Sequence, residues 1–172
     1  MKTKRLVTAA MLAAMYVVLS LTVTLNLGNM KITLDSLPII VGAALLGPVD
    51  GMLIGLLGSF INQLLTYGFT VSTLLWIIPA GVRGLIIGLY AKKHSFNMTF
   101  AQTEFITIVS AIAVTVLNTA VMYIDSKILG YYSYAYVFGA VLPRFISGII
   151  VACVLGAVLP YILKPLRQFL QK

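Results

Sequence analysis

Two arginines stand inside long apolar segments of the sequence, where an ionised side chain needs a partner. Arg83 lies near the middle of the segment Ser72–Tyr90, and Arg144 follows Pro143 in the segment Tyr136–Leu163. A charged group at the centre of a bilayer costs at least a few kcal/mol unless it is partnered. Because a guanidinium grips a carboxylate through two parallel hydrogen bonds, both arginines are candidates to bind an anionic ligand.

Side chains that suit a flat ring stand near Arg83. Trp76 precedes Arg83 by two helical turns, so the two residues share one helix face. Trp76 and Tyr67 could stack on an aromatic ligand, and the amide of Asn118 could either contact the edge of that ring or pair with another amide. An interfacial belt is the alternative for further aromatic residues expected on the same side, namely Phe69, Tyr123, Tyr131, Tyr132, Tyr134 and Tyr136.

The sequence lacks the residue patterns of catalysis. It contains no phosphate-binding glycine loop, no HExxH, no cysteine cluster and no nucleophile elbow. The single histidine, His94, has no evident partner for general base chemistry, and the lone Cys153 cannot form an intramolecular disulfide. We therefore expect no enzymatic activity, no metal and no cofactor. The net charge of +8 does not indicate nucleic-acid binding, because the cations cluster at the ends of apolar segments.

Composition places these residues on helices in a membrane. Of the 172 residues, 60% are hydrophobic and only 9% are charged, and the mean hydropathy is +1.05. A spanning helix needs roughly 20 apolar residues, so we expect a single transmembrane domain, residues 1–172, with the all-α fold of a six-helix integral membrane bundle. The six predicted helices are Arg5–Leu27, Leu37–Leu46, Val49–Leu65, Ser72–Tyr90, Phe100–Ile124 and Tyr136–Leu163.

Three basic clusters indicate how the chain crosses the membrane. If the short helix Leu37–Leu46 and its successor Val49–Leu65 each cross, all three clusters share the cytoplasmic side, as the positive-inside rule favours. Both termini are then cytoplasmic. A helix of ten residues is only about 15 Å long, so protein or a cavity must cover it. The clusters are Lys2, Lys4 and Arg5; Lys92 and Lys93; and Lys164, Arg167 and Lys172.

This topology decides which acids could form ion pairs with the two arginines. Asp50 falls at a cytoplasmic turn, which leaves Asp35 and Asp125 on the outward side. Two acids against four cations leave two positive charges uncompensated around an outward cavity, and this favours an anionic ligand over pairing within the chain. The four outward cations are Lys31, Arg83, Lys127 and Arg144.

Small residues recur at a spacing of four, which lets helix backbones approach closely. Internal packing of the bundle explains such pairs as well as a partner interface does. The pairs are Gly51 with Gly55, Gly84 with Gly88, Ala9 with Ala13, and Ala10 with Ala14.

Three segments carry a family resemblance that extends over nearly the whole chain. Leu34–Ile39 reads LDSLPI, Gly47–Gly51 reads GPVDG and Pro79–Gly88 reads PAGVRGLIIG. They resemble the substrate-binding S components of energy-coupling factor (ECF) vitamin transporters, and within these the folate family. The resemblance implies a subunit of an ABC importer in the bacterial cell membrane that captures folate from outside. It implies a T component and two ATPases as partners, and docking through Ala9, Ala10, Ala13 and Ala14.

Folate agrees with the candidate residues, because it combines a flat pterin ring with two carboxylates. An S component for a pyridoxine-type vitamin, riboflavin or thiamine is the alternative, with cationic thiamine disfavoured by the charge count. An autonomous secondary transporter should show an inverted repeat or a coupling-ion site, and the sequence shows neither. The folate contacts would be Trp76 or Tyr67 for stacking, Asp35 or Asn118 for hydrogen bonds, and Arg83, Arg144 or Lys31 for the carboxylates.

Overall fold

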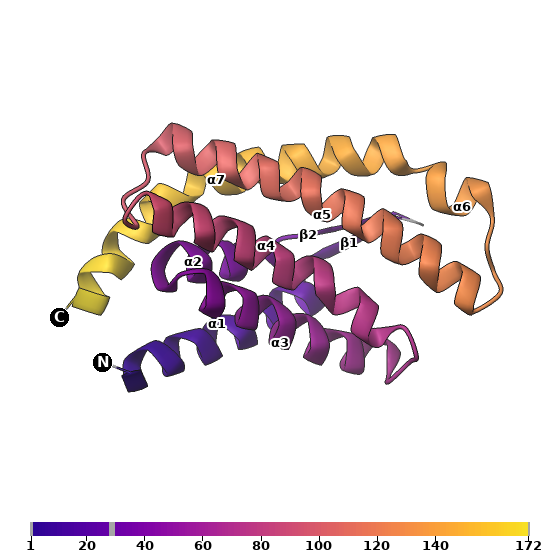
Figure 1. The fold of residues 1–172 in the computed structure, drawn as a ribbon, viewed down its shortest axis with the longest axis horizontal. Coiled ribbons are helices and arrows are strands. Elements are labelled where there is room, and N and C mark those ends of the chain that lie inside the picture. The colour runs from indigo at the N-terminus through magenta and orange to yellow at the C-terminus, as the bar shows by residue number, and fades with distance from the viewer. Residues whose placement is uncertain (1, 28–29, 172) are drawn as a thin grey trace.

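The chain folds into a bundle of helices with one short β-hairpin, as seen in a computed structural model that describes residues 2–27 and 30–171 (Figure 1). Five segments of this described chain are long and apolar enough to cross a membrane, and α2 is a shorter apolar helix. The predicted six-helix bundle is therefore confirmed. The helices are α1 (Lys2–Thr22), α2 (Ser36–Leu46), α3 (Pro48–Tyr67), α4 (Thr73–Lys93), α5 (Phe100–Ile128), the short α6 (Tyr134–Phe138) and α7 (Val141–Gln171), and the antiparallel strands are β1 (Thr24–Leu27) and β2 (Met30–Thr33).

A helical hairpin of α2 and α3 sets the direction of the later helices. Gly47 joins the two helices with a φ of 101°, a left-handed conformation that favours glycine. The short α2 is covered by protein, as expected, since Ile39 and Ile40 are each 1% exposed. Because the hairpin reverses the chain, the α4–α5 connection lies at the same end as both termini (Figure 1). We call this the basic end, after Arg5 and Lys93, and the opposite end the mouth end.

Glycines let α3 and α4 pack backbone against backbone. A Cβ atom at Gly84 would lie 2.1 Å from the carbonyl oxygen of Gly51, and one at Gly55 would lie 2.3 Å from the carbonyl oxygen of Ala80. Gly88 meets the backbone of the α2–α3 turn in the same way. The predicted glycine pairs thus serve packing inside the bundle, where they fix α4 against α3.

Gly84→Val should therefore destabilise the bundle. The new side chain would overlap the backbone of Gly51, and overpacking of this kind costs about 1–3 kcal/mol. Thermal unfolding of the purified protein in detergent should show a lower Tm, while Leu89→Val, at a 52% exposed position of the same helix, should unfold near the wild-type temperature. An unchanged Tm for Gly84→Val would contradict such close contact.

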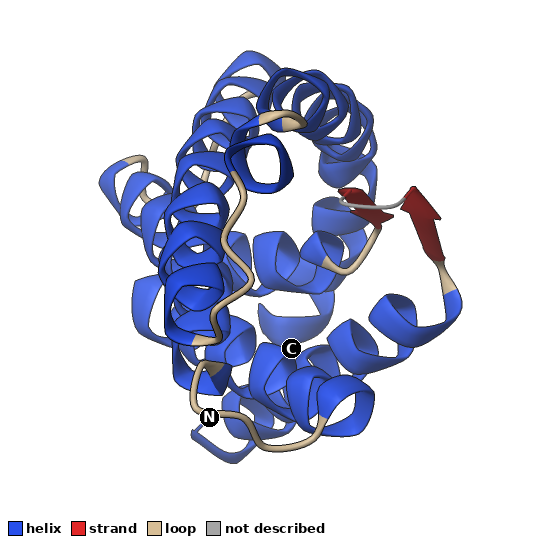
Figure 2. Cartoon of the chain, turned by 90° about the vertical axis from the view of Figure 1, so that its right-hand side faces the viewer, coloured by secondary structure: helices blue, strands red, loops and turns tan. Residues whose placement is uncertain are grey.

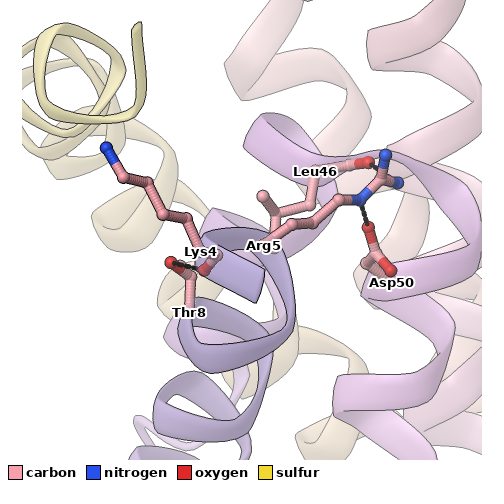
Figure 3. Close-up of polar contacts among 5 residues, drawn as sticks. All are labelled: Lys4, Arg5, Thr8, Leu46 and Asp50. Atoms are coloured by element: carbon pink, nitrogen blue, oxygen red, sulfur yellow. Dashed lines mark hydrogen bonds and ion pairs between the residues drawn. The ribbon is translucent and has the colours of Figure 1, made fainter. Parts of the chain in front are cut away.

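An ion pair joins α1 to the α2–α3 hairpin at the basic end (Figure 3). Nε of Arg5 donates a hydrogen bond to Oδ2 of Asp50, and a terminal guanidinium nitrogen donates to the carbonyl oxygen of Leu46 at 2.7 Å. Asp50 thus has its own cation at the basic end of the bundle.

Two predicted helices differ most from the structure, and the last of them also continues beyond Leu163 to Gln171. The first helix ends at Thr22 and not at Leu27, because Thr24–Leu27 pairs with β2 as a strand. The last predicted helix, Tyr136–Leu163, is divided by a turn that contains Gly139 between α6 and α7. The β-hairpin follows α1 and contacts α7 through β2, and it lies at the edge of the bundle (Figure 2).

Candidate ligand-binding site

A cavity of about 600 Å³ opens at the mouth end of the bundle. Residues of α1, α2, α3, α4, α5 and α7 line it. Its rim includes Tyr67, which is 63% exposed, and its depth reaches Leu155, which is 5% exposed. Pockets for small-molecule ligands measure about 300–1,000 Å³, so this cavity has room for a vitamin-sized molecule.

Six of the seven predicted ligand-binding residues line this cavity, although they come from distant parts of the chain. The seventh, Lys31, belongs to β2, and its side chain lies outside the described part of the structure. The fold thus gathers the candidates in one place, while their individual contacts with a ligand stay predictions. The six are Asp35, Tyr67, Trp76, Arg83, Asn118 and Arg144.

Arg83 presents an unused hydrogen-bond donor. Asp35 and Tyr16 interact electrostatically with its guanidinium. Among the described residues, however, Asp35 makes no direct ion pair with Arg83, and the buried Nε atom has no hydrogen-bond acceptor. Buried polar groups without partners are uncommon in native proteins. Arg83 is therefore the strongest candidate to donate a hydrogen bond to a ligand.

Asp125 of α5 presents an unused acceptor in the same cavity. Asp125 is only 5% exposed. Its Oδ2 atom accepts a hydrogen bond from the hydroxyl of Tyr131, whereas Oδ1 has no hydrogen-bond partner among the described residues. The rings of Tyr131 and Tyr136 meet edge to face with centroids 5.5 Å apart. A third unpartnered atom, Oε2 of Glu104, lies near Gly156 and outside the cavity.

Burial and the hydrogen bond to Asp125 raise the pKa of the Tyr131 hydroxyl above its usual value. A tyrosine hydroxyl is already protonated at neutral pH, since its ordinary pKa is about 10, so it can donate to Asp125. This fixes the carboxylate through Oδ2 and leaves Oδ1 available to a hydrogen-bond donor on a ligand.

Hydroxyl groups of α5 form a polar stripe along the cavity. Thr107, Ser110 and Thr115 line it together with Asn118. The three hydroxyls donate to backbone carbonyls three or four residues earlier, at 2.7, 2.8 and 2.9 Å, so their oxygen lone pairs are free to accept. These three residues were not predicted from the sequence, although polar positions that recur at helical spacing in an apolar segment indicate such a stripe. Tyr16, which lines the cavity from α1, was not predicted either.

Arg144 has a packing role as well as a place in the cavity. Its guanidinium donates to the carbonyl oxygen of Val137 at 3.2 Å and contacts Sδ of Met122 at 3.2 Å. These contacts tie the beginning of α7 to α6 and α5. A partner within the chain, the alternative weighed for both arginines, therefore exists for Arg144, and it includes the carbonyl group of Val137.

The expected excess of positive charge is not found among the described residues that line the cavity. Two acids and two arginines line the cavity, and their charges cancel. Lys127 was counted with the cavity from its position in the sequence, but its Nζ lies 4.0 Å from the centroid of the Tyr132 ring and outside the lining. The direction of a side chain at a helix end depends on the rotation of that helix, which charge counting does not reveal.

The four alanines predicted for docking do not share one face of α1. Ala10 and Ala14 are exposed, whereas Ala13 is 6% exposed and packs in a core cluster with Ile54. Ala9 is half-buried against that cluster. A partner helix could therefore reach Ala10 and Ala14 directly, and the docking role itself stays a prediction.

A family match over almost the whole chain identifies the bundle that holds this cavity. Residues 1–167 match the family model described as "ECF-type riboflavin transporter, S component". The chain belongs to this family. An S component is a substrate-binding subunit and not an enzyme, so the chain is a non-enzymatic, multi-pass protein of the cell membrane. The predicted membership of the ECF S components is confirmed, but the family model names riboflavin where the sequence resemblance indicated folate.

Comparison with a solved structure supports the fold of this S component. The structure described as "Structure and mechanism of the S component of a bacterial ECF transporter" is 22% identical in sequence, with a TM-score of 0.62 over 100% of both chains. This level of identity shows a shared fold alone.

Curated relatives match parts of the S component. A UPF0397 protein of Streptococcus thermophilus is 29% identical over 87 residues, which are 50% of this chain and 47% of the relative. A UPF0397 protein of Leuconostoc citreum is 44% identical over 52 residues, which are 30% and 26% of the two chains. The matches thus span about half or less of these relatives, whose names state no substrate.

Proposed function

We propose that the S component binds riboflavin in the cavity and delivers it through a T component and two ATPases. The description of the matching family carries this proposal. Riboflavin is a neutral molecule that joins a flat three-ring system to a chain of hydroxyl groups. The cavity offers aromatic faces at Trp76 and Tyr16 for the rings and the hydroxyl acceptors of α5 for the chain.

The balanced charge of the described cavity lining favours this neutral ligand over folate. The two carboxylates of folate would meet the acids Asp35 and Asp125 as well as the arginines, and like charges in a shielded site repel. A ring carbonyl of riboflavin, by contrast, could accept from Nε of Arg83 without bringing a charge. Folate is the second candidate, since the same arginines could pair with its glutamate tail.

Delivery requires the cavity to face outward and α1 to reach a partner. Because the basic end carries residues such as Arg5 and Lys93, the positive-inside rule places it and both termini in the cytoplasm. The mouth end then faces the exterior, where riboflavin would enter beside Tyr67. Ala10 and Ala14 offer the T component a smooth helix surface within the membrane.

Fluorescence titration tests the ligand, because Trp76 is the single tryptophan of the chain and lines the cavity. We expect submicromolar riboflavin to quench the emission of Trp76, and folate at the same concentrations to leave it unchanged. Trp76→Phe is the control, since it should remove the protein signal while the emission of riboflavin itself still reports binding. Quenching by folate alone would transfer the assignment to folate.

Asp125→Asn should weaken riboflavin binding about tenfold, or about 1.4 kcal/mol. The change replaces one carboxylate oxygen with an NH2 group, which donates and cannot accept. It also removes the negative charge that strengthens a hydrogen bond from the ligand. Tyr131→Phe should have a smaller effect, because it removes only the hydrogen bond that positions Asp125. Asp50→Asn alters an acid at the basic end and should bind normally in the same titration; wild-type affinity for Asp125→Asn would exclude the proposed contact.

A further inference from the structure

An apolar groove lies on the bundle apart from the ligand cavity, with a volume of about 640 Å³. It runs along α5 beside α6 and the beginning of α7, and none of its lining residues lines the cavity. Both α5 and α7 are membrane-spanning segments by length and composition, so an open apolar groove on them meets lipid. The lining residues are Val116, Thr119, Ala120, Tyr123, Ile124, Phe138, Val141 and Phe145.

A lysine stands at the mouth end of this groove. Val116, Ala120, Tyr123 and Lys127 follow one another at intervals of four, three and four residues, so they form one stripe along α5. Nζ of Lys127 lies 5.8 Å from the ring centroid of Tyr123 and 4.0 Å from that of Tyr132. No carboxylate among the described residues forms an ion pair with it. The positive-inside rule does not explain this lysine, because it lies opposite the basic end.

Aromatic rings surround the same position. Tyr123 and Tyr132 meet edge to face at 5.5 Å, and Phe138 lies 6.3 Å from Tyr123 and 5.1 Å from Tyr134 between ring centroids. The four rings belong to residues that are 37–72% exposed. Exposed tyrosines at the end of a spanning helix are typical of the level of the lipid headgroups. Of the tyrosines expected in an aromatic belt, Tyr131 and Tyr136 therefore line the ligand cavity, whereas Tyr123, Tyr132 and Tyr134 belong to this cluster.

We propose that the groove binds one anionic phospholipid, with an acyl chain along α5 and the headgroup at Lys127. The apolar lining matches hydrocarbon, and the small side chain of Ala120 leaves space for a chain of methylene groups. The headgroup supplies the negative charge that Lys127 lacks within the described chain. The site does not depend on which vitamin occupies the cavity.

Native mass spectrometry of the full chain tests this site. The protein is purified with equal amounts of phosphatidylglycerol and phosphatidylcholine that carry the same acyl chains. We expect one retained phosphatidylglycerol in about fivefold preference, the increment typical of a single lysine beside an anionic headgroup. Lys127→Gln should abolish this preference, and the matched control Lys93→Gln at the basic end should keep it.

Ala120→Phe provides a second, independent variant, because it fills the groove without changing charge. We expect it to lower the retention of both lipids while riboflavin emission still reports binding in the cavity. Equal retention of the two lipids by the wild type would overturn the proposal, as would unchanged preference in Lys127→Gln. If Ala120→Phe retains lipid normally but loses uptake with the T component, the groove is a protein interface and the lipid site is wrong.

Discussion

Arg83→Ala should weaken riboflavin binding by well over tenfold, which corresponds to more than about 1.4 kcal/mol. Arg83 lies near the middle of a membrane-spanning helix, where a charged side chain is costly. Its buried Nε atom has no hydrogen-bond acceptor among the described residues. A ligand that accepts a hydrogen bond from Nε would satisfy this donor. Alanine removes the donor and also the positive charge that interacts with the carboxylate of Asp35. Titration of riboflavin emission measures the change.

Two matched variants separate a ligand contact from a loss of folding. Arg83→Lys keeps the charge but not the planar array of donors, so its affinity should lie between those of the wild type and Arg83→Ala. Arg5→Ala breaks the ion pair with Asp50 at the basic end and should bind normally. If Arg83→Ala binds like the wild type and melts at a lower temperature, Arg83 serves only as the electrostatic partner of Asp35.

Ala14→Trp should leave riboflavin binding intact and abolish uptake by the assembled transporter. Ala14 is exposed on α1 and does not line the cavity, so a large side chain there disturbs a partner and not the ligand. Close helix packing in membranes depends on small residues at the contact. Ala10→Trp should behave in the same way. Binding and uptake are measured on cells that also express the T component and both ATPases.

The control for this surface is Val154→Trp, a similar enlargement at a 54% exposed position of α7. It should reduce neither binding nor uptake. Ala13→Trp would be a poor test, because Ala13 packs in the core and a tryptophan there would open the bundle. Uptake at the wild-type rate by both Ala10→Trp and Ala14→Trp would show that the T component docks elsewhere.

The helices could be predicted because their apolar length is a local property of the sequence. The short α2 was predictable for the same reason, and the three basic clusters showed that it had to return the chain. The β-hairpin was not predictable from composition, since the pairing of Thr24 with Thr33 depends on two four-residue strands meeting in the folded chain. The division of the last helix at Gly139 likewise depends on the contacts of α6 in the folded bundle.

The members of the cavity were predictable to a lesser degree. Arg83 and Trp76 could be found because a charge and a tryptophan at helical spacing are conspicuous in an apolar segment. The rotation of each helix about its axis decides the rest, and it turned Lys127 away from the cavity and Ala13 into the core. For the same reason, charge counting along the chain overestimated the positive charge of the cavity and favoured an anionic ligand.

Uptake of labelled riboflavin tests whether this chain is the riboflavin-binding subunit of a complete importer. Cells that lack their own riboflavin importer would express this chain alone, the T component with both ATPases alone, or all of these together. We expect uptake only in the complete set, with loss of uptake in Arg83→Ala and no uptake of labelled folate. Riboflavin uptake by this chain alone, or uptake of folate but not riboflavin by the complete set, would contradict it.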